Sequence, residues 1–580
     1  MYIRRSQALK IRFNAARIAF ARKHPPHIAN GEELRYKDDR GQLTHIANFT
    51  KGLPHNVQTG IITDPADYQQ LVEGTKSGDV RDFAATPLGP PGMDGVEFPE
   101  WQSQIAQDEN VTVRAWESQG AGLTFDLEGP DAQAVTMPPA PTLDSQELVT
   151  EMLEVYQMAL LRDVPFANFD ETPAIDKAIA QLNDTPWIKN PESLNLSPAE
   201  KARVRQPFNR QTVYRGRTPG DKVGPYLSQF LLIGNKGLGG VNDLADGLIE
   251  YGSITIDQRV RVAEAQKDYI TTWEAWIDVQ NGADLRGLET YNNSPSYRFI
   301  ATPRDLATYV HYDALYQAYL NACLILLGLG VDFDPNIPFQ KPDFIDKQQG
   351  FAQFGGPHIL SLVTEVATRA LKAVRFQKYN VHRRLRPEGV GGWVNRFQNG
   401  DTQNLEVMQT LVNGLGTDLL QEIAQHNREQ NQRFGDRAQD ANNNYDNSFL
   451  LPMAFPEGSP MHPAYGAGHA TVAGACVTIL KAFFDTDATL DFCFQPSANG
   501  SRLESVALDK RLTVGGELDK LAANISIGRN WAGVHYYSDY IESLRLGEEI
   551  AIGILQEQKL TYRENFSMTI PLFDGGSVTI

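Results

Sequence analysis

Apolar residues recur at every third or fourth position along most of the chain after about residue 144, which is the spacing of one buried helix face. The first such segment follows a capping Asp or Ser and carries Leu148, Met152, Leu153, Tyr156 and Leu160. The same spacing predicts further helices over Asp257–Val279, Thr302–Leu329, Leu360–Tyr379, Asp401–Arg433, Gly468–Phe484 and Val534–Gln556. At Thr302 a capping residue is followed by Pro303 in the first turn. We therefore expect a mainly α fold built from packed helical bundles.

The alternating pattern of a β-strand is rare in this chain. It is confined to Val111–Phe125 and Phe566–Ile580, where we expect small hairpins. Residues 1–143 are interrupted by Pro and Gly, notably over Thr86–Gly95 and Met137–Pro141, and have only short apolar runs. We therefore divide the chain into a loop-rich N-terminal region, residues 1–143, which we expect to contact neighbouring subunits, and a helical body, residues 144–580.

The segment from Arg4 to Lys23 is basic and contains no acidic residue, but its apolar residues are interleaved with Arg and Lys. It therefore lacks the apolar core of a secretory signal. We interpret it as an arm that packs on a neighbouring subunit. A transit peptide and a membrane-surface helix are the alternatives that its composition leaves open.

Composition limits the classes of partner. In the 580-residue chain, 71 acidic against 53 basic residues give a formal net charge of -18, which disfavours a nucleic-acid partner. The longest apolar stretch, near Cys323–Val331, is far shorter than the roughly 20 residues that span a bilayer, so we expect no membrane span. Three cysteines are too few for a disulfide framework or a thiolate zinc site. The compartment is left open, with the cytoplasm as the default.

Three later segments carry the residues of a candidate site, and the first runs from Lys378 to Pro387. It contains Arg383, Arg384 and Arg386. These ammonium and guanidinium groups suit a tetrahedral oxyanion, and the proline fixes the chain direction after Arg386. Taken alone, the segment is better explained as a solvated helix end, where cations favour the helix dipole.

The second segment, His462–Ala470, is a glycine-bearing turn that leads into an apolar helix. Backbone N–H groups at a helix start can bind an oxyanion, and Gly468 lets the backbone come close to it. His469 follows at once and can act as an acid or a base. The alternative interpretation is a capped turn with a surface histidine.

The third segment, Gly528–Asp539, contains Arg529 and places His535 and Asp539 four residues apart on one helix face. A carboxylate beside an imidazole orients the ring and raises its basicity, as a metal-ligating histidine needs. An isolated His–Asp pair on a helix is more often a structural hydrogen bond. Only the combination of the three segments therefore indicates a functional site.

Together and in this order, the three segments resemble the signature that vanadium haloperoxidases share with acid phosphatases of the phosphatidic-acid-phosphatase type. Seven residues separate Lys378 from Arg386, one more than in the general family, and this spacing resembles the red-algal and cyanobacterial bromoperoxidases. The stretches Glu457-Gly-Ser-Pro and Leu521-Ala-Ala-Asn-Ile are also similar to that group. The resemblance covers the chain from about residue 300 onward and implies the same helical-bundle fold.

The resemblance implies a vanadium-dependent bromoperoxidase. In such an enzyme, vanadate and hydrogen peroxide oxidise bromide, and iodide, to a hypohalous species that halogenates small organic acceptors. Vanadate would be bound by Lys378, Arg386, Gly468, His469, Arg529 and His535. Among these, His535 would be the axial vanadium ligand, His469 the acid–base residue and Lys378 the group that polarises peroxide. Asp539 would support His535 from behind.

The same resemblance places Arg375 and His462 at the halide side of the pocket. Most members of the family have a serine just before the glycine of the second segment, whereas this chain has Ala467. The missing hydroxyl removes a hydrogen bond to a charged group, which is worth about 1.5 to 3 kcal/mol. We therefore expect either weaker vanadate binding or a shift in the electronics of the bound vanadate, without loss of the site, and we leave the halide range open.

Red-algal relatives also imply a structural calcium ion, with ligands at Phe339, Asp346 and Gln348. Oxygen donors suit this hard cation, and the alternative is an ordinary polar loop. The family further implies a homo-oligomer, either a dimer or a dodecamer, with the N-terminal region as a source of intersubunit contacts.

Two other functions compete with the haloperoxidase interpretation. In an acid phosphatase the same cage would bind phosphate, with His535 as nucleophile and His469 as acid. The spacing of the first segment, Arg375, His462 and the absence of membrane spans argue against it. In a non-catalytic oxyanion binder, suggested by Ala467, catalysis would have lapsed. The presence of both active-site histidines argues against that function.

Overall fold

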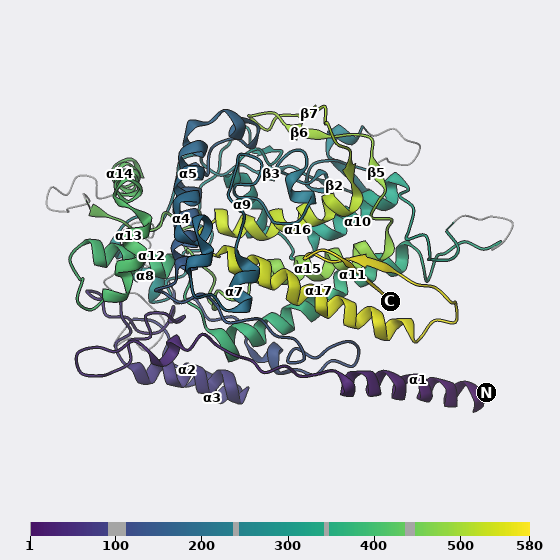
Figure 1. Ribbon diagram of the computed structural model, residues 1–580, viewed down its shortest axis with the longest axis horizontal. Helices are drawn as coiled ribbons and strands as arrows, with labels where there is room; N and C mark the ends of the chain where they lie inside the picture. Colours follow the sequence, from purple (N-terminus) through teal and green to yellow (C-terminus); the bar gives the residue numbers. More distant parts are fainter. Residues whose placement is uncertain (1, 91–111, 236–242, 341–346, 435–446) are drawn as a thin grey trace.

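The computed structural model of this protein describes residues 2–90, 112–235, 243–340, 347–434 and 447–580, which form helices joined by loops and small ladders (Figure 1). The first helices are α1 (Tyr2–Ala21), α2 (Pro65–Ser77), α3 (Val80–Ala84), α4 (Gln146–Leu161), α5 (Pro173–Asp184), α6 (Pro186–Lys189) and α7 (Pro198–Arg203). The middle ones are α8 (Trp273–Gln280), α9 (Pro303–Tyr312), α10 (Gln317–Leu329), α11 (Gly356–Phe376), α12 (Pro387–Gln398), α13 (Gln409–Leu415) and α14 (Thr417–Phe434). The last are α15 (Gly468–Phe483), α16 (Val514–Trp531) and α17 (Tyr537–Lys559). The expected mainly α fold is confirmed.

The strands form antiparallel ladders of two strands each, scattered around the helices. The pairs are β1 (Leu248–Tyr251) with β2 (Ile254–Asp257), β3 (Val260–Arg261) with β4 (Tyr297–Arg298), β5 (Thr489–Leu490) with β8 (Leu512–Thr513), β6 (Phe494–Pro496) with β7 (Leu503–Ser505), and β9 (Thr569–Pro571) with β10 (Ser577–Thr579). In the last pair Val578 lies opposite Ile570, so the predicted C-terminal hairpin is confirmed.

Helix α15 forms the centre of the body and packs against α11, α16 and α17 (Figure 1). It is buried from Ala470 to Phe483, because its residues are apolar on all sides. Glycines bring α15 and α17 into close contact: a Cβ on Gly474 would lie 2.2 Å from the Leu544 carbonyl oxygen. The Ala467 amide, just before α15, donates to Ser543 Oγ of α17 at 2.8 Å. The N-terminal turns of both helices therefore lie at the same end of the pair.

One large hydrophobic core extends through most of the described chain, from Ile46 to Phe573. A smaller cluster lies under α2 and consists of Leu53, Ile62, Tyr68, Leu71 and Val72. Residues before position 144, such as Val135 and Leu143, belong to the large core. Parts of the N-terminal region are thus packed against the helical body. Within the described ranges, no helix has both the length and the apolar character needed to cross a membrane.

Several predicted helix starts are confirmed by their caps. Ser145 Oγ accepts the Leu148 amide at the start of α4, at 3.1 Å. Thr302 begins α9 with a reciprocal capping box to Asp305 and has Pro303 in the first turn, as expected. The predicted helix Leu360–Tyr379 is α11, continued by a π-turn, Gln377–His382.

Other expectations were wrong. Of the predicted helix Asp257–Val279 only α8 is helical, because Asp257 ends β2, which pairs with β1, and Val260–Arg261 form β3, which pairs with β4. The predicted helix Thr302–Leu329 is broken after Tyr312, and Asp401–Arg433 contains two helices, α13 and α14. The described part of Val111–Phe125 forms an isolated bridge at Val113 and a short turn of 3-10 helix, not a hairpin.

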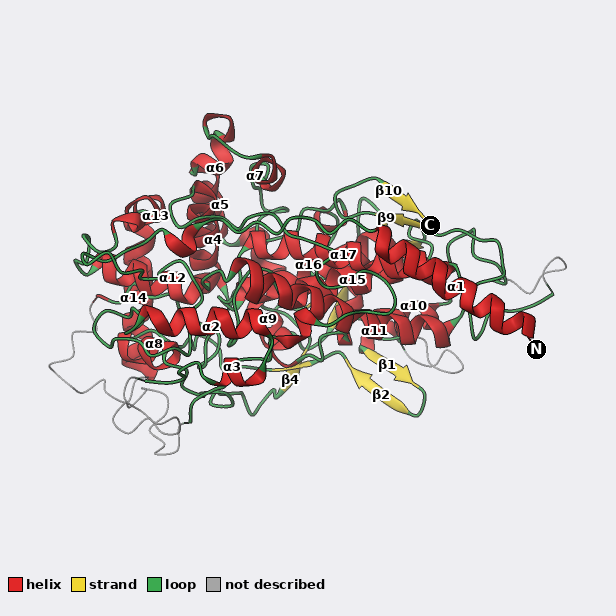
Figure 2. Ribbon diagram, turned by 90° about the horizontal axis from the view of Figure 1, so that it is seen from below, coloured by secondary structure: helices red, strands yellow, loops and turns green. Residues whose placement is uncertain are grey.

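The N-terminal region is less loop-rich than expected, since it contains α1 and α2. Helix α2 has start and stop residues that are typical of a helix in sequence. Asp64 caps its start, Pro65 occupies the first turn, and Gly78 ends it with a positive φ. In contrast, α1 has no apolar face for periodicity to reveal. Figure 2 shows α1 along the edge of the body, with the N-terminus at its far end.

Candidate active site

The three predicted segments meet at one cavity of about 380 Å³. Six of the residues predicted for the site line it: Arg375, His462, Gly468, His469, Arg529 and His535. Lys378 and Arg386 are almost fully buried, at 0 and 2% exposure, and reach the same cluster from within the protein. Gly468 and His469 come from the start of α15 and His535 lies just before α17, so the contact between these two helices brings this part of the site together.

Arg386 is the hub that joins the three segments. Its Nε donates to the carbonyl oxygen of His462 at 3.0 Å, and one Nη contacts the His462 ring at Nδ1, at 2.8 Å. The other Nη donates to the Val534 carbonyl at 2.8 Å and lies 2.9 Å from His535 Nε2. Burial lowers the pKa of Arg386 to about 9.

These contacts define the protonation of His535. Because a guanidinium can only donate, Nε2 must be the unprotonated nitrogen, and Nδ1 carries the hydrogen that it donates to Asp539 Oδ2 at 2.8 Å. Burial, with the neighbouring Arg386 and Lys378, lowers the pKa of His535 well below its ordinary value. The ring is therefore neutral, with its lone pair on the nitrogen that points away from the carboxylate.

Asp539 is itself held firmly in the first turn of α17. Its Oδ2 also accepts the Tyr536 amide at 3.1 Å, and its Oδ1 accepts a hydrogen bond from Arg384 at 2.9 Å. Arg384 in turn forms an ion pair with Glu151 at 2.8 Å. A ligand bound by His535 would therefore meet an imidazole of fixed orientation.

Lys378 and Arg529 have only neutral oxygens as hydrogen-bond partners among the described residues. Lys378 lies in the π-turn, and its Nζ donates to the carbonyls of Pro463 at 2.7 Å and Ala464 at 3.2 Å. Burial and the nearby Arg386 lower the pKa of Lys378 well below its ordinary value. Arg529 donates to the Val310 carbonyl at 2.9 Å, and its buried Nε has no partner among the described residues. An oxyanion would supply the missing charge and acceptors, so this cage fits one.

The N-terminal turn of α15 supplies backbone donors to the same cavity. Gly468 is its first residue, and Ala467 at the N-cap position offers no side chain to the free N–H groups. His469 follows and is 16% exposed, with its Nε2 2.9 Å from Asp313 Oδ1. The sequence pattern did not indicate Asp313 as a site residue, because we expected an unbroken helix there. The one sequence feature that could have indicated this residue was the end of the amphipathic helix pattern just before it.

A carboxylate at the cavity edge joins the two residues predicted for halide. Glu117 forms an ion pair with Arg375, and its Oε1 lies 3.4 Å from His462 Nε2. Burial opposes ionisation, but these neighbours hold the pKa of Glu117 well below its ordinary range. Burial and the nearby Lys378 lower the pKa of His462, which is therefore neutral. Sequence reasoning missed Glu117, because it lies in a stretch predicted to be a strand.

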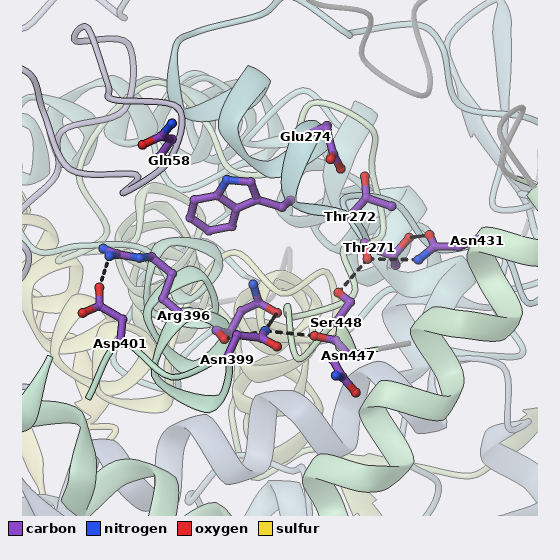
Figure 3. A pocket seen from close by; sticks show the side chains of 12 residues that line it. Gln58, Thr271, Thr272, Glu274, Arg396, Asn399, Asp401, Asn431, Asn447 and Ser448 are labelled. Carbon is purple, nitrogen blue, oxygen red and sulfur yellow. Dashed lines mark hydrogen bonds and ion pairs between the residues drawn. The ribbon is translucent and has the colours of Figure 1, made fainter. Parts of the chain in front are cut away.

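A second cavity, of about 480 Å³, contains none of the predicted site residues (Figure 3). Its polar groups largely satisfy one another: Arg396 pairs with Asp401, and the Thr271 hydroxyl donates to Asn431 Oδ1 at 2.6 Å. The chemistry of the three segments therefore belongs to the first cavity.

The calcium site stays a prediction, because the described structure includes only two of its three predicted ligand residues. The Phe339 carbonyl accepts the Gly350 amide at 3.0 Å, and Gln348 is exposed. Asp346 lies outside the described residues. Within the described ranges, no group of three or more His, Cys, Asp or Glu is arranged to hold a metal ion.

A helical body with a buried cationic cage beside a neutral, carboxylate-supported histidine defines the class of helical oxyanion-binding enzymes. Comparison with known proteins narrows the class. Residues 422–563 match the family model described as the VCPO second helical-bundle domain. The chain is 51% identical to a vanadium-dependent bromoperoxidase of Corallina pilulifera and 50% identical to that of Corallina officinalis, each over 98% of this chain and 97% of the relative.

A more distant relative, the vanadium-dependent bromoperoxidase of Ascophyllum nodosum, is 30% identical over 97% of this chain and 90% of its own length. The solved homohexameric structure of the second vanadate-dependent bromoperoxidase of that organism matches with a TM-score of 0.81 and 25% identity, covering 100% of this chain and 90% of the other. The chain belongs to the vanadium-dependent bromoperoxidase family.

Proposed function

We propose that this protein binds vanadate through His535 and uses it with hydrogen peroxide to oxidise bromide, and iodide, for the halogenation of small organic acceptors. The observation that carries the proposal is the neutral His535, whose Nε2 lone pair lies beside Arg386 and whose Nδ1–H is held by Asp539. The names of the relatives, at about half identity over nearly the whole chain, support the same chemistry.

The cage fits vanadate in both charge and shape. Vanadate, a phosphate-shaped oxyanion, supplies a Lewis-acid centre that activates peroxide toward halide. Lys378, Arg386 and Arg529 would neutralise its oxygens, and the Gly468 amide would donate a backbone hydrogen bond. The same three cations are buried and have no carboxylate as a hydrogen-bond partner among the described residues. The cage is therefore already formed before an anion binds.

His469 is the residue that we propose for proton transfer. Asp313 accepts from its Nε2 and so orients the ring, while the partial exposure of the side chain lets it exchange protons with solvent. Lys378 would polarise the bound peroxide from the buried side. Arg375 and His462, joined by Glu117, would form the halide side of the cavity.

The acid phosphatase alternative is not favoured, because the three relatives above are all bromoperoxidases. The test is to strip the protein with chelator and measure bromination of a dimedone-type acceptor with peroxide and bromide, before and after adding orthovanadate. We expect bromination only after the addition. Hydrolysis of nitrophenyl phosphate without any bromination would instead favour the phosphatase.

We also propose that the protein is a homo-oligomer, as the homohexameric neighbour suggests. Helix α1 is a candidate contact, since Phe13 and Phe20 are 61 and 92% exposed. A structural calcium ion near Phe339 and Gln348 stays a weaker proposal, carried by family resemblance alone. Removal of calcium with EGTA would lower the thermal midpoint if the ion is bound.

A further inference from the structure

One guanidinium in the active-site cavity has no role in the proposed chemistry. Arg114 lines the same cavity as His469, Arg529 and His535. Its Nη1 is buried and has no hydrogen-bond partner, and its side chain forms no ion pair among the described residues. Burial lowers the pKa of Arg114, with the more distant Glu457 opposing that effect. Arg114 is partly buried as a residue, and a buried guanidinium nitrogen without an acceptor is costly unless a ligand supplies one.

Three carboxylates of this cavity are paired with other groups: Glu117 pairs with Arg375, Asp313 holds His469, and Glu457 lies 3.2 Å from His311 Nε2. The fourth, Glu289, accepts the Tyr291 hydroxyl at 3.1 Å through Oε1, and it forms no ion pair with Arg114 among the described residues. Arg286, the neighbouring cation, is paired with Asp284 at 2.7 Å. Arg114 is thus the cation of this wall that an additional anion would meet first.

The backbone holds Arg114 in place. Its amide donates to the Gly282 carbonyl at 2.7 Å, and the Asp284 amide donates to the Thr112 carbonyl at 2.9 Å. Two residues later, Trp116 Nε1 donates to the Lys51 carbonyl at 2.8 Å. The guanidinium is therefore presented from an anchored segment, as a binding residue requires.

The cavity is larger than an oxyanion and a halide need. Its volume of about 380 Å³ is in the range of pockets that take small organic ligands. Part of its wall is apolar or aromatic, with Tyr312, Leu315, Leu371 and Pro460. A flat organic molecule could lie on this wall while an acidic group reaches the guanidinium.

We propose that Arg114 forms a subsite for the carboxylate of an aromatic organic acceptor and holds that acceptor in the cavity where oxidised halogen is produced. This inference rests on the proposed function. Bromide is the other anion of the proposed reaction, but a monatomic ion would contact the guanidinium at one point only. A carboxylate accepts two hydrogen bonds from the planar guanidinium fork and leaves its ring for the apolar wall.

The test compares two phenols that differ in charge: 4-hydroxyphenylacetate and its methyl ester. In Arg114→Gln we expect the KM for bromination of the carboxylate to rise about tenfold or more, the range of one hydrogen bond to a charged group. The KM for the ester and the KM for bromide should stay unchanged. Arg114→Lys, which keeps the charge, should recover part of the loss. Arg502→Gln is the matched control, because the side chain of this arginine, just before β7, is 71% exposed.

A second measurement needs no turnover. Saturation-transfer NMR on vanadate-free protein should detect 4-hydroxyphenylacetate with the unmodified chain and with Arg502→Gln, but not with Arg114→Gln. Equal KM changes for acid and ester, or no change for either, would overturn the proposal. A rise in the KM for bromide alone would make Arg114 a halide residue instead. If the unmodified protein brominates neither phenol, the proposed function fails, and the NMR result still decides the subsite.

Discussion

At the scale of single residues, hydrogen bonds determine which atoms of the site donate and which accept. Arg386 contacts a nitrogen of His535 that cannot carry a hydrogen, and Asp539 takes the hydrogen from the other nitrogen. Arg384 and the Tyr536 amide then fix the carboxylate. The orientation and tautomer of His535 are therefore set in large part by Asp539 and Arg384, which are not among the residues proposed to contact the ligand.

The cage residues could be predicted from sequence, because their types and spacings are specific in combination. Lys378, Arg386, His469, Arg529 and His535 do lie together in the structure. Asp313, Glu117 and Arg114 were missed. Each comes from a loop or extended segment whose partner is more than a hundred positions away, and no local pattern encodes such a contact.

Gly458 offers a test of the packing beside the cavity. A Cβ there would lie 1.9 Å from Glu388 Oε2, and φ is +62°. We expect Gly458→Ala to destabilise the protein by about 2 to 4 kcal/mol, from the clash and the left-handed backbone together. Gly252→Ala is the control, because its φ is +60° and no atom lies within 4 Å. Equal unfolding midpoints for the two variants in denaturant would contradict this account.

The raised pKa of Asp221 predicts how the free energy of unfolding changes with pH. Its Oδ2 accepts from the Thr218 amide at 2.9 Å and hydroxyl at 2.6 Å, and burial raises the pKa of Asp221 to about 7. The folded state therefore holds a proton that the unfolded state releases near pH 4. This group's contribution is fully present below that pH and is lost as pH rises through about 7.

In Asp221→Asn, which cannot ionise, the loss between pH 4 and pH 7 should shrink by a few kcal/mol. Denaturant midpoints measured across that range would detect the change. Asp491→Asn, at a carboxylate whose side chain is 85% exposed, should leave the profile unaltered. A pH profile for Asp221→Asn that parallels the unmodified protein would rule out this role.

At the scale of elements, the departures from regular helix lie at the site. Lys378 is in a π-turn, whose extra residue per turn accords with the extra residue between Lys378 and Arg386. The break between α9 and α10 places Asp313 beside His469. Apolar periodicity predicted that these segments are helical but not where the helix is interrupted, because the interrupted turns are stabilised by distant contacts.

The N-terminus of α15 allows a direct test of its anion site. Ala467→Ser would add a hydroxyl at the N-cap position, next to the cage. We expect vanadate to bind about tenfold more tightly, since one hydrogen bond to a charged group is gained. Equilibrium dialysis gives the affinity. If the new hydroxyl only caps the helix, the thermal midpoint of the vanadate-free protein would rise and the affinity would not change.

At the scale of the whole molecule, the fold class followed from periodicity, whereas the way the N-terminal region joins the body did not. Ile46, Val135 and Leu143 share a core with α4 and α15 although little in their local pattern marks them as buried. Loop residues that pack against distant parts of the chain follow no regular sequence period, so the sequence pattern does not predict their burial. The division at residue 143 therefore stays a prediction, as does the role of the region in assembly.

The exposed aromatic residues of α1 predict a loss of assembly when they are removed. We expect the double variant Phe13→Ser with Phe20→Ser to elute as a smaller species, because these rings would leave a subunit contact. Light scattering coupled to gel filtration measures the mass. Phe351→Ser, at a phenylalanine of 73% exposure far along the chain, is the comparison. An unchanged mass for the double variant would remove α1 from the interface.

We propose that His535 binds vanadium in a cationic cage that is already formed before vanadate is added. The most direct measurement is the vanadium content of stripped protein after incubation with orthovanadate and gel filtration, for the unmodified chain and for His535→Ala. We predict stoichiometric vanadium in the first and none in the second, with His535→Ala still folded by circular dichroism. Equal vanadium content, or bromination at the full rate by His535→Ala, would contradict the account.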